Sequence, residues 1–189
     1  MNQTLILASS SPRRRQLLQE AGIIVEVHPA HIPEVRSPGE PPVEYVRRLA
    51  QEKAETVARN FPDRHILAAD TTVVVDHQVL EKPVDLADAR RMLRLLSGRE
   101  HSVITAVSLV RPGAGSATRI ATTKVFFRDV SDREINAYIA GGEPMDKAGA
   151  YAIQGGAGPW VERIDGEYSN VVGLPLSLVT DLLREAGLL

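Results

Sequence analysis

Near its amino end the chain reads Leu5-Ile6-Leu7-Ala8-Ser9-Ser10-Ser11-Pro12-Arg13-Arg14-Arg15. The apolar run predicts a short buried strand, and Pro12 suits the first helical turn, because proline lacks an N–H that would be unpaired there. Ser11 is then expected as the N-cap. A helix N-terminus attracts anions, so arginines beside it indicate a polyanion site, most simply for phosphate. Solvated arginines at the start of a surface helix are the alternative.

After this strand–turn–helix unit, patterns typical of strands and of helices alternate along the chain. Asp85 and the pair Ser131/Glu134 have the spacing of helix N-caps. Asp165-Gly166 predicts a hairpin turn between Trp160–Ile164 and Tyr168–Val172. The remaining main elements are expected at Pro12–Ala21, Val43–Asn60, Ile66–Val75, Leu86–Leu96, Val103–Val110 and Arg119–Phe127. Alternation combined with hairpins predicts an α/β fold around a mixed sheet, and residues 1–189 are expected to form a single domain.

The composition narrows the function class. A formal net charge of −2 argues against a general nucleic-acid binder, and the absence of cysteine excludes disulfides, thiolate metal sites and cysteine nucleophiles. No apolar stretch approaches the length of a membrane span, and no signal-peptide pattern opens the chain. We therefore expect a cytoplasmic protein with no membrane partner.

Two charged residues break the pattern of their surroundings. Asp70 interrupts the apolar run Ile66–Val75, where an unpaired buried carboxylate is costly, so a metal, a cation or a water-activating role is favoured over a solvated strand end. Lys53 lies on the inward stripe of its predicted helix, where a snorkelling lysine is the ordinary interpretation. Lys82, which follows a predicted strand, is ambiguous by itself.

A segment rich in glycine, residues 141–158, contains Asp146, Lys147 and Gln154. Glycines allow a backbone to approach a ligand closely. Ala150-Tyr151-Ala152-Ile153 is too apolar for a mere linker, although a flexible loop is the alternative. The five histidines form no convincing metal set.

Taken together, five motifs resemble the Maf family of nucleoside triphosphate pyrophosphatases, in that family's order and spacing over nearly the whole chain. They are Leu7–Arg14, Ala69-Asp70-Thr71, Glu81-Lys82-Pro83, Asp146–Tyr151 and Val172-Gly173-Leu174-Pro175. The resemblance implies a mixed, twisted central sheet flanked by helices, with a cleft between two lobes, similar to the inosine triphosphate pyrophosphatases. It also implies hydrolysis of the bond between the α and β phosphates, with release of a nucleoside monophosphate and pyrophosphate.

The segment Asp146–Tyr151 with Gln154 resembles the family branch that acts on dTTP and UTP. By the same resemblance Asp70 is the proton acceptor, and Arg13, Thr71 and Gln154 stand where the branches differ. Ala152 stands at a position where glycine is common in the family. This difference affects the expected geometry of the loop and not the expected activity.

The chemistry of the individual side chains agrees with these expectations. Arginine can bind phosphate in a bidentate manner and lysine supplies a point charge, so we expect Arg13, Lys53 and Lys82 to compensate the charge of a nucleoside triphosphate. The other expected substrate-binding residues are Ser9, Thr71, Lys147 and Gln154. The amide of Gln154 matches the O4 acceptor and N3–H donor of thymine or uracil.

The catalytic set is accordingly Asp70, Lys53 and Lys82. A divalent cation (Mg²⁺, Mn²⁺ or Co²⁺) is expected on Asp70, with Glu34 as a second ligand and Glu40 as the alternative to it. From the sequence we expect Asp70→Asn to abolish turnover, and Lys53→Ala to impair catalysis with little change in thermal stability.

Two other interpretations stay open. The same hydrolysis could act on 7-methyl-GTP or on modified pyrimidine nucleotides. A non-enzymatic, nucleic-acid-binding regulator of septum formation is the second, against which the net charge and the lack of a basic or aromatic platform both count. No stable nucleic-acid partner is therefore expected, and a homodimer is an expectation from the family alone.

Overall fold

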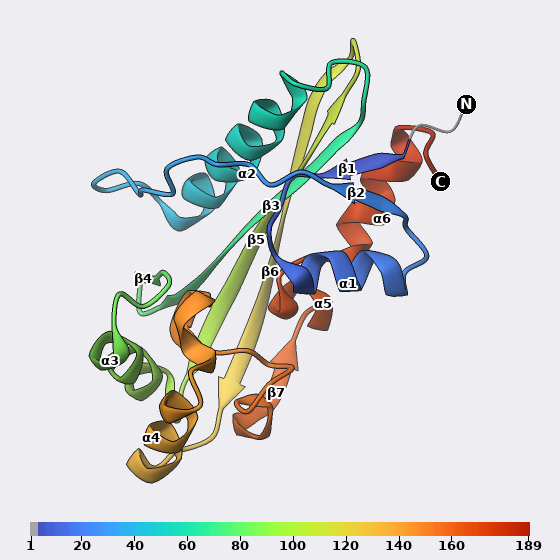
Figure 1. The fold of residues 1–189 in the computed structure, drawn as a ribbon. Coiled ribbons are helices and arrows are strands. Elements are labelled where there is room, and N and C mark those ends of the chain that lie inside the picture. Colours follow the sequence, from blue (N-terminus) through green and yellow to red (C-terminus); the bar gives the residue numbers. More distant parts are fainter. Residues whose placement is uncertain (1–3) are drawn as a thin grey trace. The chain divides into compact units, whose positions relative to one another are not determined.

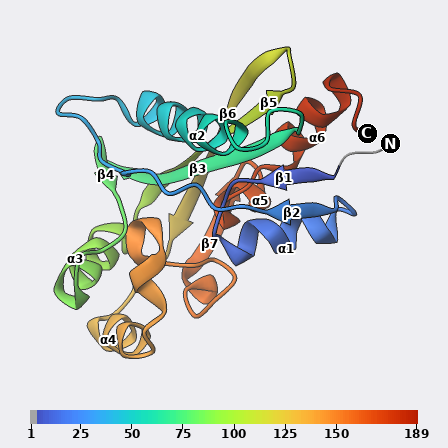
Figure 2. The same ribbon diagram turned by 45° about the horizontal axis from the view of Figure 1, so that its top comes forward.

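A computed structural model describes residues 4–189. Figure 1 shows the fold, and Figure 2 shows it from a second direction. The elements follow in this order: β1 (Leu5–Leu7), α1 (Pro12–Glu20), β2 (Val25–Val27), α2 (Pro42–Ala58), β3 (Ile66–Val75), β4 (Gln78–Leu80), α3 (Leu86–Leu96), β5 (Glu100–Arg111), β6 (Gly115–Phe127), α4 (Asp132–Ala140), η1 (Glu143–Asp146), η2 (Ala148–Ala150), η3 (Gly158–Trp160), β7 (Val161–Asp165), α5 (Tyr168–Val172) and α6 (Leu176–Glu185).

The described strands form one mixed sheet in the order β2-β1-β3-β5-β6-β7, with β4 paired to β3. Strand β1 runs parallel to both β2 and β3, whereas the pairs β3–β4 and β6–β7 are antiparallel. The predicted α/β fold with a mixed sheet flanked by helices is confirmed.

The chain divides into two compact units. Unit 1 contains the described residues up to Thr71 together with Thr105–Ala121 and Gly173–Leu189, and unit 2 contains Thr72–Ile104 and Thr122–Val172. The long strands β3, β5 and β6 each contribute residues to both units. The cleft between lobes that the family resemblance implies stays a prediction.

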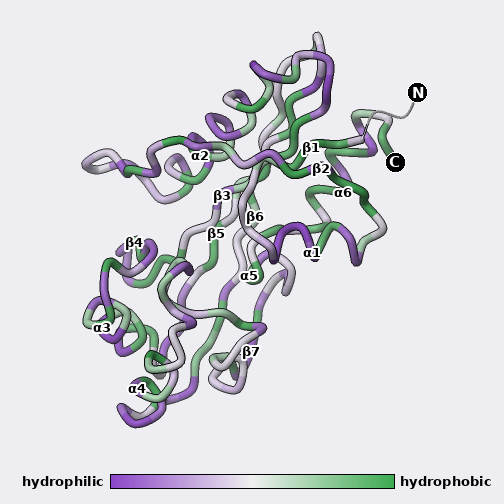
Figure 3. The backbone as a smooth tube through the Cα atoms, viewed as in Figure 1, coloured by the Kyte–Doolittle hydropathy of each residue, from purple (hydrophilic) through white to green (hydrophobic). Residues whose placement is uncertain are grey.

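In unit 1, the strand–turn–helix unit around residues 5–15 forms as the sequence predicts. Strand β1 is fully buried and hydrophobic, whereas α1 begins with its arginines, a contrast that is visible in Figure 3. Ser11 occupies the N-cap position with extended backbone, but its side chain makes no capping hydrogen bond. Figures 1 and 2 show α2 on one side of strands β1–β3 and α1 on the other.

Alternation along the strands determines which residues meet α2. One hydrophobic cluster joins β1, β3 and α2, and its buried members are Ile6, Ala8, Ala54, Val57, Ile66 and Ala68. Ile66 and Ala68 lie two residues apart, so they share the face of β3 that α2 covers. The next position on that face is Asp70, which is how a carboxylate comes to lie beneath α2.

In unit 2, several local signals in the sequence are confirmed. The side chain of Asp85 accepts a hydrogen bond from the backbone N–H of Asp88 at 2.7 Å, and α3 follows with the predicted bounds. Ser131 and Glu134 form the predicted capping box at the start of α4. Local capping chemistry is therefore a sufficient signal for these two helices.

The predicted hairpin after Asp165-Gly166 is wrong. Residues Tyr168–Val172 form the short helix α5 instead of a strand. The reason is tertiary: Asn170 is fully buried, and its side-chain amide donates to the carbonyl of Val103 at 3.1 Å and to the Thr123 hydroxyl at 2.9 Å. These long-range bonds override the local preference for a strand.

Candidate active site

The site in unit 1 is centred on an ion pair between Lys53 and Asp70. The ammonium of Lys53 donates to Oδ1 of Asp70 at 2.6 Å, and the two residues are only 7% and 6% exposed. Lys53 extends from the inner face of α2, between Ala50 and Val57, and Asp70 lies on the face of β3 that α2 covers. The interpretation of Lys53 as a snorkelling lysine is therefore wrong, because its charged end is directed into the protein.

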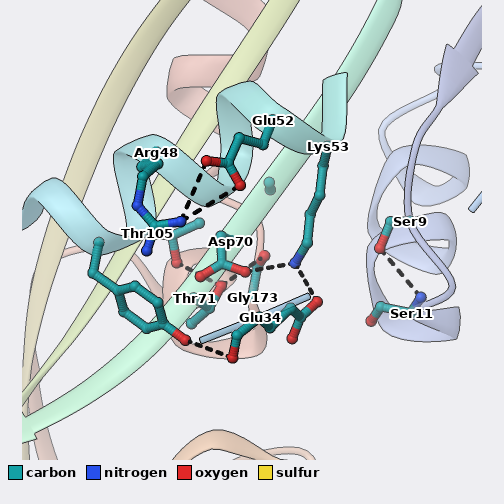
Figure 4. Close-up of polar contacts among 12 residues, drawn as sticks. Ser9, Ser11, Glu34, Arg48, Glu52, Lys53, Asp70, Thr71, Thr105 and Gly173 are labelled. Atoms are coloured by element: carbon teal, nitrogen blue, oxygen red, sulfur yellow. Dashed lines mark hydrogen bonds and ion pairs between the residues drawn. The ribbon is translucent and has the colours of Figure 1, made fainter. Parts of the chain in front are cut away.

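Glu34 approaches the same ammonium from the loop before α2. Its Oε1 lies 2.6 Å from Nζ of Lys53, so one ammonium lies between two carboxylates, as Figure 4 shows. The hydroxyl of Tyr45 donates to the backbone carbonyl of Glu34 at 3.3 Å and so links the loop to α2. The structure thus brings Glu34 to Asp70, as its predicted role requires.

Burial dominates the electrostatics of Asp70. Loss of solvent raises the pKa of the carboxyl above its ordinary value, while the positive charges of Lys53 and Arg14 act against that rise. The nearby carboxylate of Glu34 raises the pKa further. Asp70 is therefore a stronger base than an exposed aspartate, and two cations favour its ionised form.

Arg14 joins α1 to the segments on either side of Asp70. Its guanidinium donates to the carbonyls of Ala69 at 2.7 Å and Gly173 at 2.8 Å, to the hydroxyl of Thr71 at 3.0 Å, and to that of Ser9 at 3.3 Å. Burial lowers the pKa of the guanidinium, although arginine stays protonated in proteins. Arg14 is therefore engaged in holding protein groups, and the prediction that Arg13 binds phosphate stays a prediction.

Thr71 and Ser9 both take part in this network. The Thr71 hydroxyl lies 2.9 Å from that of Thr105 and 3.3 Å from the carbonyl of Gly173, in addition to its bond from Arg14. A hydroxyl has one donor and two acceptor positions, so these contacts use its capacity in full. Ser9, which is nearly buried, accepts from the backbone N–H of Ser11 at 3.2 Å (Figure 4). The Thr71 hydroxyl is therefore engaged by protein groups, and its part in substrate binding stays a prediction.

The other predicted site residues, Lys82, Lys147 and Gln154, lie in unit 2. Lys82 is exposed in the segment between β4 and α3, and the N–H of Gly149 donates to the neighbouring Glu81 carbonyl at 3.2 Å. The ammonium of Lys147 donates to the backbone carbonyl of Glu143 and to the Asp146 carboxylate, both at 2.6 Å. Lys147 therefore has a structural task within its own loop, whereas Gln154 is exposed.

A divalent metal was predicted on Asp70 and Glu34. No three His, Asp or Glu side chains converge into a protein cage anywhere between residues 4 and 189. The donor set nevertheless fits Mg²⁺, which is commonly held by one or two carboxylates while substrate phosphates and water complete its shell. Both carboxylates contact the ammonium of Lys53, so both belong to the same site, and a metal on this pair stays a prediction.

The sequence analysis singled out Arg13 rather than Arg14, and it missed Thr105. A signal for Arg14 was present: the buried Leu17 and Leu18 lie three and four residues after it, so all three share one face of α1. Thr105, in contrast, is one polar residue in the long strand β5 and has no local signal.

The family of the chain follows from comparison with known proteins. Residues 4–186 match the model of the family described as Maf-like protein. This chain belongs to the Maf family. No helix among its described residues is long and apolar enough to cross a membrane.

Relatives in the Maf family match over the whole chain. A protein of Koribacter versatilis is 52% identical over 185 residues, which cover 98% of this chain and 95% of that protein. A protein of Citrifermentans bemidjiense is 51% identical over 189 residues, covering 100% of this chain and 98% of the relative. Both are named dTTP/UTP pyrophosphatase. The structure of the Staphylococcus aureus Ham1 protein is similar in fold, with a TM-score of 0.57, 14% identity and coverage of 96% of this chain and 98% of that one.

Proposed function

We propose that this protein is a nucleoside triphosphate pyrophosphatase, a hydrolase that cleaves dTTP and UTP between the α and β phosphates. The products are the nucleoside monophosphate and pyrophosphate. The substrate assignment is supported by the full-length relatives at about half identity that carry this name. The chemistry is supported above all by one observation, the carboxylate of Asp70 buried opposite the ammonium of Lys53.

Asp70 acts as the general base. Its oxygen accepts the proton of a water molecule as that water attacks a phosphorus of the anhydride, and the bridging bond breaks to release pyrophosphate. An ordinary aspartate is too weak a base for this step at neutral pH, so the burial that raises the pKa of Asp70 serves the reaction. Lys53 keeps the carboxylate ionised and fixes its orientation.

Positively charged side chains compensate the charge of the substrate. The phosphates are bound by Arg13 at the start of α1, by Lys53 and by Lys82. Lys147 adds to the positive electrostatic potential around them. Ser9 lies just beyond the carboxyl end of β1, which is where ligands bind in open α/β sheets. Gln154 recognises the thymine or uracil base through its amide donor and acceptor.

A divalent cation, Mg²⁺, Mn²⁺ or Co²⁺, would be held by Asp70 and Glu34 together with substrate phosphates. When bound it supplies positive charge to the phosphate oxygens and lowers the pKa of the attacking water. Glu34 has a second task in the same site, since it completes the pairing of Lys53. The protein is further proposed to act in the cytoplasm, without a stable nucleic-acid partner, and as a homodimer.

A pyrophosphate-release assay tests this function. Purified protein is assayed with dTTP, UTP, CTP, GTP, ATP and 7-methyl-GTP in the presence of each of the three metals, with Asp70→Asn as the control for contaminating activity. We expect the highest kcat/KM for dTTP and UTP. Preference for 7-methyl-GTP would contradict the substrate assignment, and salt-dependent DNA binding without turnover would contradict the enzymatic function itself.

A further inference from the structure

The backbone turn that carries Gln154 is anchored at both ends. Residues Ala152–Gly155 form a turn closed by a hydrogen bond from the N–H of Gly155 to the carbonyl of Ala152 at 3.1 Å, and Gln154 lies exposed within it. At the start of this turn the N–H of Ala152 donates to the hydroxyl of Tyr138 at 3.1 Å. Just after the turn, the N–H of Gly156 donates to Oε2 of Glu143 at 3.2 Å.

The two anchoring side chains are themselves joined. The hydroxyl of Tyr138 donates to Oε1 of Glu143 at 2.8 Å, so this hydroxyl links the carboxylate to the backbone of Ala152. The ring of Tyr138 is 9% exposed and packs against Trp160 with 4.9 Å between ring centres. On the other side, Lys147 holds the backbone carbonyl of Glu143 at 2.6 Å. The backbone of Glu143 is therefore held by Lys147, and its carboxylate is held by Tyr138.

The glycines after Gln154 allow Glu143 to reach the backbone directly. A Cβ atom added at Gly155 would lie 1.9 Å from Oε1 of Glu143, and one added at Gly156 would lie 3.0 Å from the ring of Tyr138. No side chain fits at Gly155 unless the carboxylate moves. The contact between Glu143 and the turn is thus a close one that depends on the absence of a side chain.

We propose that Glu143, acting with Tyr138, is a positioning residue for pyrimidine selectivity, because it fixes the turn that presents Gln154 to the base. This inference rests on the proposed function and on the role of Gln154 in it. The amide of Gln154 can pair with both O4 and N3–H of uracil only when the turn places it at the edge of the base, so a restricted position of the turn favours that pairing. A backbone held at both ends provides that restriction before the substrate binds.

The test compares selectivity, measured as the ratio of kcat/KM for UTP to that for CTP. The variants are Glu143→Ala, the conservative pair Glu143→Gln and Tyr138→Phe, Gln154→Ala, and the double variant Glu143→Ala/Gln154→Ala. Glu162→Gln, at an exposed position on β7, is the matched control. Thermal melts establish that each variant is folded. If Glu143→Ala does not fold, Glu143→Gln and Tyr138→Phe still test the inference.

We expect Gln154→Ala to lower the selectivity ratio about tenfold, as removal of a specific hydrogen-bonding group does. Glu143→Ala should lower it to a similar extent, chiefly through KM for UTP, and Glu143→Gln less, because the amide oxygen still accepts one bond. In the double variant the ratio should fall no further than in Gln154→Ala alone, since the two residues act through one contact. A structural effect alone would change stability without this dependence on Gln154.

Two results overturn the inference while leaving the proposed function intact. One is a ratio in Glu143→Ala and Glu143→Gln that stays equal to that of Glu162→Gln. The other is a Glu143→Ala effect that adds fully to that of Gln154→Ala, which would mean that the two residues act independently. If the wild-type protein hydrolyses neither UTP nor dTTP, the proposed function itself fails, and this inference fails with it.

Discussion

The ammonium of Lys53 lies 2.6 Å from Oδ1 of Asp70, inside a region of unit 1 where both residues are less than a tenth exposed. Removing two charges from water costs several kcal/mol per ion, roughly, and their attraction offsets this only with good geometry and further hydrogen bonds. A pair of apolar residues would stabilise the same place at least as well. The pair is therefore better explained by chemistry than by stability, and it makes the two residues interdependent in any variant.

Replacement of Lys53 by methionine tests that interdependence. The variant removes the ammonium that pairs with both Asp70 and Glu34, so the free energy of unfolding should fall by about 3 kcal/mol or more. Turnover should fall as well, since Asp70 is then harder to keep ionised. The expectation from sequence of little change in thermal stability is accordingly revised.

Thermal melts and steady-state kinetics on Lys53→Met, beside the wild type, measure both effects. The exposed lysine Lys124, replaced in the same way, provides the control for loss of a lysine. Normal kcat in a folded Lys53→Met protein would contradict the role of Lys53 in orienting the base.

Asp70→Asn should separate chemistry from stability. The amide cannot accept the proton of the attacking water, so kcat should fall at least about a hundredfold. Lys53 retains Glu34 as a partner at 2.6 Å, so the melting temperature should change much less than in Lys53→Met. Substrate affinity, measured by calorimetry with a non-hydrolysable UTP analogue, should stay within a few-fold of the wild type. Hydrolysis by Asp70→Asn at a near-normal rate would exclude Asp70 as the base.

Asp70 could be found from the sequence because it violates a local rule. Asp70 is the one charged residue in the ten-residue strand β3, and this anomaly is visible in the sequence without knowledge of the residues that contact it. Helix caps such as Asp85 and Ser131 are equally local, since donor and acceptor lie within a few residues of each other. These features depend on short stretches of chain, and the structure confirms them.

Other features depend on contacts that no short stretch contains. The pairing of Lys53 with Glu34 joins the middle of α2 to the loop that precedes this helix, and it is one reason why the lysine is buried rather than snorkelling. The helix at Tyr168–Val172 forms because Asn170 bonds to two other strands, against its own turn signal. Sequence patterns identify which residues are unusual but do not identify their partners.

The three adjacent arginines should differ sharply in their effects. Arg14→Ala removes donors from the carbonyls of Ala69 and Gly173, and an unsatisfied buried acceptor costs about 1–3 kcal/mol. We expect the melting temperature of Arg14→Ala to fall by at least about 4 °C, and Arg14→Lys to recover little, because an ammonium cannot reproduce the planar fork. Arg13→Ala should instead raise KM for the nucleotide.

The exposed Arg15, replaced by alanine, serves as the control in both measurements. The same set of melts and KM values could contradict the assignment. If Arg14→Ala matched Arg15→Ala in stability while losing substrate affinity, Arg14 rather than Arg13 would be the phosphate ligand.

A buried histidine in unit 2 should make the stability of the protein depend on pH. His101 is 2% exposed, its Nε2 lies 2.8 Å from the Tyr151 hydroxyl, and the ring of Phe127 packs edge-on at 4.9 Å between ring centres. Burial lowers the pKa of His101 from its ordinary 6.5 to about 4. The unfolded chain therefore binds this proton at a higher pH than the folded protein does.

Because of that difference in proton binding, the free energy of unfolding decreases as the pH falls. The contribution of His101 to stability is fully present above pH 6.5, and it is lost progressively as the pH falls from 6.5 toward 4, by about 3 kcal/mol in total. His101→Gln keeps a polar partner for Tyr151 but does not titrate, so its unfolding free energy should fall less over this interval. Urea denaturation at half-unit steps of pH measures the slope. His31→Gln, at an exposed loop position, should retain the wild-type slope, and an equally steep decline in His101→Gln would mean that other groups cause the acid sensitivity.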